Sequence, residues 1–182
     1  MKVETFETPQ DAAKALAGEV AELIRTRAAE GKNVVLGLAT GATPLPFYAE
    51  LVRMHKEEGL SFANVISFNL DEYSGLDRDH PESYWYFMHT NLFNHIDIKP
   101  ENINLPSGTV KDDEIAAHCA AYEQKIKDCG GIDLQILGIG RTGHIGFNEP
   151  CDHFPVMTHE VKLTEMTREA NKSFFSSIDE VP

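Results

Sequence analysis

The 182-residue sequence contains few cysteines, a deficit of basic residues and no long apolar run. Its three cysteines (Cys119, Cys129 and Cys151) are odd in number and have no metal-type spacing, which argues against a disulfide framework or a zinc site. Basic residues number 16 against 29 acidic ones, and the net charge of −13 argues against a nucleic-acid partner. No run reaches transmembrane length, and the N-terminus lacks the charged-then-apolar order of a signal peptide. We therefore expect a soluble cytoplasmic protein with no membrane partner.

The sequence does have the composition of a globular domain. Charged residues make up 25% and hydrophobic residues 42%, which is ordinary for a soluble fold. The length is sufficient to bury a sizeable core, and the chain shows no internal repeat, low-complexity tract or clear linker. We expect one domain over residues 1–182.

Short apolar runs alternate with amphipathic segments along the chain. Strands are predicted at 33–39, 64–70, 132–137 and 160–163. Helices are predicted at 9–30, 44–58, 82–94, 112–128 and 167–176, the first one capped by Thr8 with Pro9 in its first turn. This alternation is typical of an α/β fold with an open, mainly parallel sheet and helices on both faces, a Rossmann-like arrangement.

Three polar loops follow predicted strands. They are Thr40 to Thr43, Asp71 to Tyr73, and Gly138 to Glu149. In parallel sheets, ligands bind at the carboxyl ends of the strands, which lie along one edge. The sequence therefore predicts a ligand site where the three loops converge.

The third loop pairs a histidine with a carboxylate. His144 follows Gly143, and Glu149 stands five residues later, so the carboxylate can fix the tautomer of the imidazole for proton transfer. The alternative is that both are plain surface residues. The spacing Gly138-x-Gly140-x-x-Gly143 also matches the dinucleotide-binding fingerprint, but Pro150 interrupts the long helix which that motif requires, and we interpret the match as coincidental.

The first two loops each have a functional and a plain interpretation. Thr40 to Thr43 precede a helix expected to begin at Pro44, and amide groups with two hydroxyls at a helix N-terminus form a natural phosphate seat. The alternative is a simple strand-to-helix turn with Thr43 as the N-cap. Asp71 and Glu72 point in roughly opposite directions at a strand end, so one of them can face a pocket as a base for a carbon-bound proton. The alternative is an ordinary turn carboxylate.

Taken together, three motifs resemble the glucosamine-6-phosphate deaminase family in order and spacing: 38–44 (LATGATP), 68–73 (FNLDEY) with 80–84 (HPESY), and 143–150 (GHIGFNEP). The related 6-phosphogluconolactonases share a Gly-His loop, but the Asp-Glu-Tyr block and the Asn-Glu-Pro ending resemble the deaminases. The resemblance implies an enzyme that converts glucosamine 6-phosphate and water to fructose 6-phosphate and ammonia, with no metal or organic cofactor. The alternatives are a lactonase-like hydrolase and a non-catalytic sugar-phosphate sensor, a role that this fold plays in some transcriptional regulators.

The resemblance also implies roles for individual residues. His144 would open the pyranose ring with Glu149 orienting it, and Asp71 would move the C2 proton to C1. The residues expected to bind the substrate, with its phosphate on the first loop, are Thr40, Gly41, Ala42, Thr43, Gly138, Gly146 and Lys172.

The sequence departs from the family pattern in three places. Thr142 stands in the catalytic loop where many members have Asp, and threonine can form a hydrogen bond there but supplies no charge. The phosphate-binding arginine of the family aligns with Ser173, so Lys172 is the nearest cation. Family members continue beyond Pro182, and we expect the chain to lack a C-terminal part that carries further strands and a phosphate-binding lysine. Whether the chain forms a homo-oligomer is left open.

Overall fold

The structure, a computed structural model, describes residues 2–153, 157–172 and 175–182. The helices are α1 (Pro9–Ala29), α2 (Leu45–Glu58), α3 (Tyr84–Asn91), α4 (Ile115–Asp128) and α5 (Glu165–Asn171). The strands are β1 (Val34–Leu38), β2 (Val65–Asn69), β3 (Ile103–Asn104) and β4 (Leu134–Gln135). Short 3-10 turns lie at Phe93–His95, Pro100–Asn102, Asp112–Glu114 and Ile178–Glu180.

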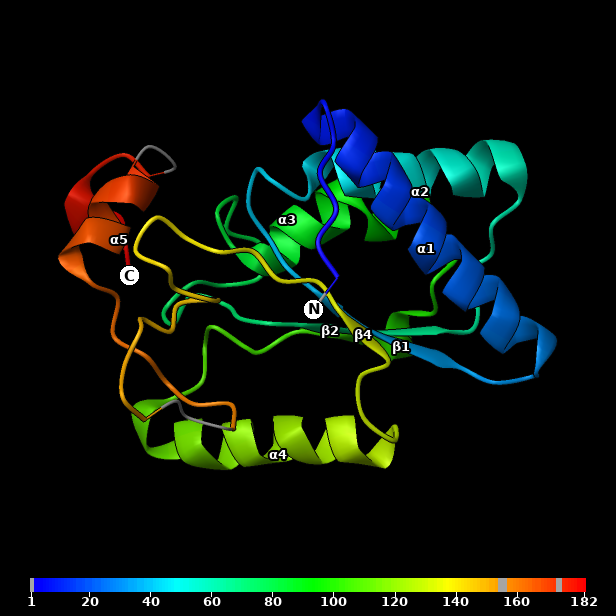
Figure 1. Ribbon diagram of the computed structural model, residues 1–182. Helices are drawn as coiled ribbons and strands as arrows, with labels where there is room; N and C mark the ends of the chain where they lie inside the picture. Colours follow the sequence, from blue (N-terminus) through cyan, green and yellow to red (C-terminus); the bar gives the residue numbers. More distant parts are fainter. Residues whose placement is uncertain (1, 154–156, 173–174) are drawn as a thin grey trace.

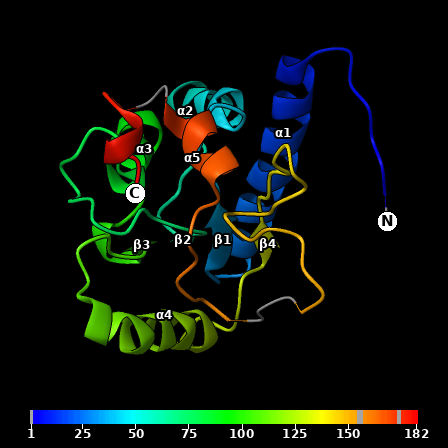
Figure 2. The same cartoon turned by 90° about the vertical axis from the view of Figure 1, so that its left-hand side faces the viewer.

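The four strands form one parallel sheet in the order β3-β2-β1-β4. Figure 1 and Figure 2 show α1, α2 and α3 on one face of this sheet and α4 on the other. The open parallel α/β arrangement expected from the sequence is therefore confirmed. Among the described helices, none combines the length and the apolar character that crossing a bilayer requires.

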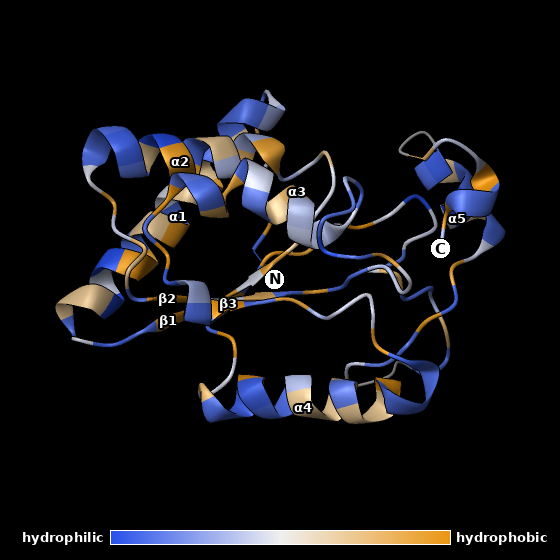
Figure 3. Cartoon of the chain, turned by 180° about the vertical axis from the view of Figure 1, so that it is seen from behind, coloured by the Kyte–Doolittle hydropathy of each residue, from blue (hydrophilic) through white to orange (hydrophobic). Residues whose placement is uncertain are grey.

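The central strand β1 is apolar on both faces, as a strand covered by helices on both sides requires. All five residues of β1 are buried, with no alternation between apolar and polar positions. Figure 3 shows the hydrophobic strands between the helical layers. On the α1 face the core is broad, since small side chains such as Ala17 and Ala21 allow α1 to approach α2 closely, and Tyr48 and Leu51 of α2 fill the remaining space.

The helix ends follow the local sequence signals. Thr8 Oγ1 accepts a hydrogen bond of 3.1 Å from the Asp11 amide, and Pro9 opens α1, as predicted. Gly59 ends α2 in the left-handed conformation, with φ of 70°, which costs a glycine little. Ser83 caps α3 by accepting from the Tyr86 amide.

Several predicted boundaries were wrong. The helix expected over 82–94 ends at Asn91, because Leu92 leaves helical geometry and buries its side chain. Residues 160–163 form no strand, because the preceding Thr158 is held by Glu123 of α4, with its amide and hydroxyl 2.7 and 2.8 Å from Glu123 Oε1. The strand at 132–137 shortens to β4, α5 begins two residues earlier than expected, and β3 was not predicted.

The α4 face of the sheet is packed much more loosely than the α1 face. Tyr122 is the buried residue of α4, and it packs in a small cluster with Val35 and Phe68. Its hydroxyl donates to the backbone carbonyl of Asn69, at 2.8 Å. Beside this cluster lies a cavity of about 1090 Å³, lined by residues of β2, α4 and 157–163 among others.

Candidate active site

The three predicted loops lie at the carboxyl ends of β1, β2 and β4, which are neighbours in the sheet. Because the strands are parallel, all three loops leave the sheet along the same edge. The convergence expected from the sequence is therefore present, and each loop contributes a different kind of group.

Asp71 supplies a half-buried carboxyl group just beyond β2. Loss of hydration, and to a smaller extent the charge of Glu72, raises the pKa of Asp71 to about 7. Gly146 of the third loop packs against this group: a Cβ at position 146 would lie 3.6 Å from Asp71 Oδ2 and 3.1 Å from Leu70 Cδ2. A carboxyl group with this pKa can take up and release a proton near neutral pH.

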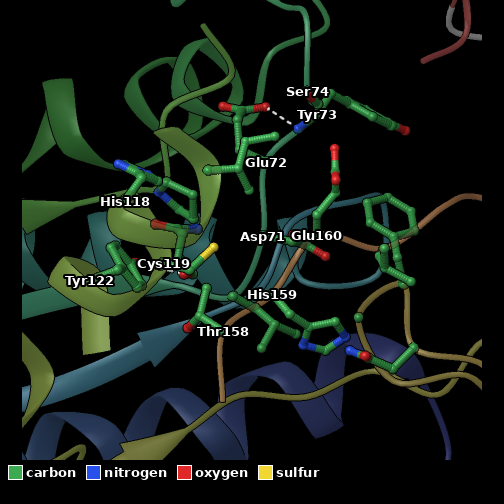
Figure 4. Close-up of a pocket in the computed structure, with 18 of the residues that line it drawn as sticks. Asp71, Glu72, Tyr73, Ser74, His118, Cys119, Tyr122, Thr158, His159 and Glu160 are labelled. Atoms are coloured by element: carbon green, nitrogen blue, oxygen red, sulfur yellow. Dashed lines mark hydrogen bonds between the residues drawn. The ribbon is translucent and has the colours of Figure 1, made fainter. Parts of the chain in front are cut away.

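Glu72 has a different role from its neighbour. Its carboxylate accepts a hydrogen bond of 2.9 Å from the backbone amide of Tyr73, which Figure 4 shows. It also accepts bonds of 2.9 Å from the amides of Tyr84 and Trp85, in the first turn of α3. Burial raises the pKa of Glu72, while these three amides lower it. Both carboxylates border the cavity, but the oxygens of Glu72 are engaged by the helix.

His144 lies in a tight turn that glycine makes possible. The Gly140 amide donates to the His144 carbonyl at 2.8 Å, and the Gly143 amide donates to the Gly140 carbonyl at 2.9 Å. The imidazole packs directly on Gly140, where an added Cβ would come closer to His144 Nε2 than any nonbonded contact allows. Glycine at position 140 therefore leaves the space that the histidine ring occupies. Residues 141–150 form no helix, so the long helix of a dinucleotide-binding motif does not follow the third glycine.

Glu149 and Thr142 surround one nitrogen of the imidazole. His144 Nδ1 lies 3.0 Å from Thr142 Oγ1 and 3.3 Å from Glu149 Oε1. Hydrogen bonds from Thr142 and His144 lower the pKa of Glu149, which opposes the effect of its partial burial. An ionised carboxylate only accepts hydrogen bonds, so it favours the Nδ1–H form of the ring and leaves Nε2 as the proton acceptor.

The first loop offers free backbone amides. Gly41, Ala42 and Thr43 are exposed, and within the described residues their amides donate no hydrogen bond. The expectation that Pro44 begins α2 was wrong by one residue, because α2 begins at Leu45; Pro44 is its cap position, and no side chain caps the helix. Unpaired amides before a helix can hold an anion, which is the phosphate seat that the sequence suggests.

Tyr84, which the sequence analysis did not single out, connects all three loops. Its hydroxyl interacts with the side chains of Tyr73 and Thr40, and burial together with the charge of Asp71 raises its pKa well above the usual value. Its ring stacks on Phe147, with centroids 6.2 Å apart. The sequence offered two signals for it, its place at the end of the motif 80–84 and the aromatic composition of 82–94, and a plain core helix would explain the second equally well.

Two predicted residues are not brought into this arrangement by any described contact. Gly138 is exposed, and open space surrounds the position where its Cβ would lie. Lys172 is exposed at the end of α5, with its Nζ 3.8 Å from Glu169, and in the described part of the chain it forms no hydrogen bond with the first loop. Ser173 lies outside the described residues. Within those residues, no group of three or more His, Cys, Asp or Glu side chains could hold a metal ion.

Comparison with known proteins finds a matching family model, similar sequences and a similar solved structure. A family model for "Glucosamine-6-phosphate isomerases/6-phosphogluconolactonase" matches residues 7–148. A glucosamine-6-phosphate deaminase of Thermoanaerobacter sp. (strain X514) is 54% identical over 164 residues, covering 90% of this chain and 64% of that protein. One from Bacillus pumilus (strain SAFR-032) is 50% identical and covers 100% and 73%. A solved structure of a monomeric glucosamine-6-phosphate deaminase superimposes with a TM-score of 0.93 at 46% identity, covering 100% of this chain and 73% of that one. The chain thus spans about two thirds of the length of these relatives.

Proposed function

The chain belongs to the family of glucosamine-6-phosphate isomerases and 6-phosphogluconolactonases, and on that premise we propose that it converts glucosamine 6-phosphate to fructose 6-phosphate and ammonia. The observation that supports the proposal is the closeness of Gly146, in the His144 loop, to Asp71: a Cβ added at position 146 would lie 3.6 Å from Asp71 Oδ2. An acid/base group for ring opening and a second one for a carbon-bound proton are the two functions that this reaction needs.

The chemistry divides between the two sides of the site. His144 moves a proton between the O1 hydroxyl and the ring oxygen, which opens the pyranose to the aldehyde. Asp71 as carboxylate then takes the C2 proton while a proton of the substrate ammonium group passes to O1, which gives an enolamine, and Asp71 returns its proton to C1 to give the protonated imine of the ketose. Water adds at C2, ammonia leaves, and fructose 6-phosphate remains. A pKa near 7 suits Asp71 for both halves of the proton transfer.

The remaining residues are assigned to binding and orientation. The phosphate lies on the amides and hydroxyls of Thr40, Gly41, Ala42 and Thr43, where the helix N-terminus favours an anion. Glu149 and Thr142 orient the imidazole. Gly146 allows close approach beside Asp71, whereas Gly138 and Lys172 remain predictions without a described contact to the site.

The specific activity can be tested on the chain directly. The purified 182-residue protein is supplied with glucosamine 6-phosphate, and both ammonia and fructose 6-phosphate are measured. Equal release of the two products supports the proposal. Binding of the sugar phosphate, measured by calorimetry, without either product would instead favour the non-catalytic sensor. Acid release from 6-phosphogluconolactone would favour the lactonase. A cytoplasmic location stays a prediction.

A further inference from the structure

Helix α5 contacts Glu149 through two threonine hydroxyls. Thr164 Oγ1 and Thr167 Oγ1 each lie 3.3 Å from Glu149 Oε1, and the two hydroxyl oxygens lie 3.0 Å apart. The same carboxylate oxygen lies 3.3 Å from His144 Nδ1. One atom of Glu149 therefore joins α5 to the imidazole.

The number of available protons determines which group donates to Glu149. The Thr167 amide donates to Thr164 Oγ1, at 3.3 Å. If the Thr164 hydroxyl donates to Thr167 Oγ1, the proton of the Thr167 hydroxyl goes to Glu149 Oε1. If the Thr164 hydroxyl instead donates to Glu149, the Thr167 hydroxyl still has Glu149 as its acceptor. In a third arrangement the Thr167 hydroxyl donates to Thr164 Oγ1 while Thr164 donates to Glu149. In the contact between Thr167 and Glu149 the hydroxyl is the donor, because an ionised carboxylate only accepts.

The two threonines differ in burial. Thr164 is exposed and is the N-cap of α5, so its hydroxyl already has a structural role. The Thr167 side chain is nearly enclosed, because the residue is 6% exposed. Valine has the same shape and would be the natural residue at such a position if the hydroxyl had no role. A buried hydroxyl needs a hydrogen-bond partner, and here its partners are Glu149 and Thr164.

We propose that Thr167 is a positioning residue for His144. Its hydroxyl holds Glu149 Oε1 against His144 Nδ1, which keeps the neutral imidazole in the Nδ1–H form and leaves Nε2 to exchange protons with the sugar. The last step rests on the proposed function, whereas the control of the tautomer does not. The other end of α5 reaches the Asp71 side, where Asn171 Nδ2 donates to the Tyr73 hydroxyl at 2.9 Å.

The test compares two substitutions at one position. Thr167→Val keeps the shape and removes the hydroxyl, and Thr167→Ser keeps the hydroxyl and removes the methyl group. In protein with ¹⁵N-labelled histidine, the chemical shifts of the two ring nitrogens of His144 report its tautomer. They are measured at a pH where the ring is neutral. His144→Gln assigns the signals among the eight histidines. We expect the Nδ1–H form to predominate in the wild type and in Thr167→Ser, and a mixture of tautomers in Thr167→Val.

Kinetics provide the second measurement. Thr167→Val should lower kcat by about fivefold to tenfold with KM within about twofold of wild type, and Thr167→Ser should restore most of kcat. Equal tautomer populations in wild type and Thr167→Val would overturn the proposal. If the wild type releases no ammonia, the proposed function fails while the NMR comparison still decides the role of Thr167. If Thr167→Val does not fold, Thr167→Ala replaces it in the same comparison.

Discussion

Asp71 and His144 lie on two sides of one candidate site, but the chain holds them in place by different means. Asp71 extends β2, a strand with parallel partners on both sides, and the Leu70 amide still donates to the Leu38 carbonyl, at 3.1 Å. His144 follows β4, an edge strand of two residues, and lies in a loop. Its position depends on the fit against Gly140 and on hydrogen bonds to Thr142 and Glu149.

The difference predicts where the site tolerates change. On the Asp71 side, the sheet carries the backbone, so a substitution of the side chain should alter chemistry and leave geometry intact. On the His144 side, the geometry itself depends on single atoms, because few backbone hydrogen bonds support the loop. Small changes near His144 should therefore act through displacement of the ring.

The largest expected effect comes from removing the carboxylate on the sheet side. Asp71→Asn should lower the rate of ammonia release by about 10³-fold, within the range that general acid–base groups contribute. Exchange of the C2 proton with solvent deuterium should fall by a similar factor, while the dissociation constant for the sugar phosphate changes little. Unchanged exchange would remove Asp71 from the proton transfer.

A smaller loss is expected from one methyl group on the loop side. Gly140→Ala places a Cβ into the His144 ring, so the imidazole must move, and a displacement of this kind typically costs about 10²-fold in rate. Gly18→Ala in α1 is the control, because open space surrounds the position of its Cβ, and its rate should stay within about twofold of wild type. Equal losses in the two variants would contradict the difference between the two sides.

The smallest expected effect is on stability, and it depends on pH. The pKa of Asp71 is raised from 3.8 to about 7, so the folded state keeps a proton that the unfolded state releases between these values. Its contribution to stability is complete below about pH 4 and is lost as the pH rises through about 7. Each pKa unit is worth about 1.4 kcal/mol, and because the carboxyl group is partly hydrated we expect about 2 kcal/mol in all.

Asp71→Asn should therefore gain about 2 kcal/mol in unfolding free energy over wild type between pH 4 and pH 8. Urea unfolding at several pH values measures the difference. Asp79→Asn, an exposed position in a nearby loop, is the control and should show no such trend with pH. A difference in unfolding free energy between Asp71→Asn and wild type that does not change with pH would contradict the raised pKa of Asp71.

The sequence predicted the sheet side of the site more completely than the loop side. The apolar run at 64–70 placed Asp71 at the end of a buried strand, and β2 confirms this. The sequence also paired His144 with Glu149, but no local pattern showed that Thr167, further along the chain, completes the pair. The contact between Thr167 and Glu149 depends on how α5 packs against the loop, and the hydrophobic periodicity of the sequence does not predict that packing.

Two further features could not be predicted from the sequence, each for a physical reason. The strand β3 has two residues and lies between Pro100 and Pro106, so it is too short to show a periodic pattern. Tyr84 is one of several aromatic residues in a short helix, and burial alone accounts for such a residue. Its role follows from three contacts that come from separate parts of the chain.

The carboxylate of Glu72 has a consequence for the order of folding. Helix α3 has eight residues, too few for a helix to persist by itself in water. Two of its first amides are satisfied by an acceptor that becomes available only when β2 has placed Glu72 beside them. We therefore expect α3 to form after the β1–β2 pair during refolding. Tyr84, which contacts all three loops, should then reach its position late.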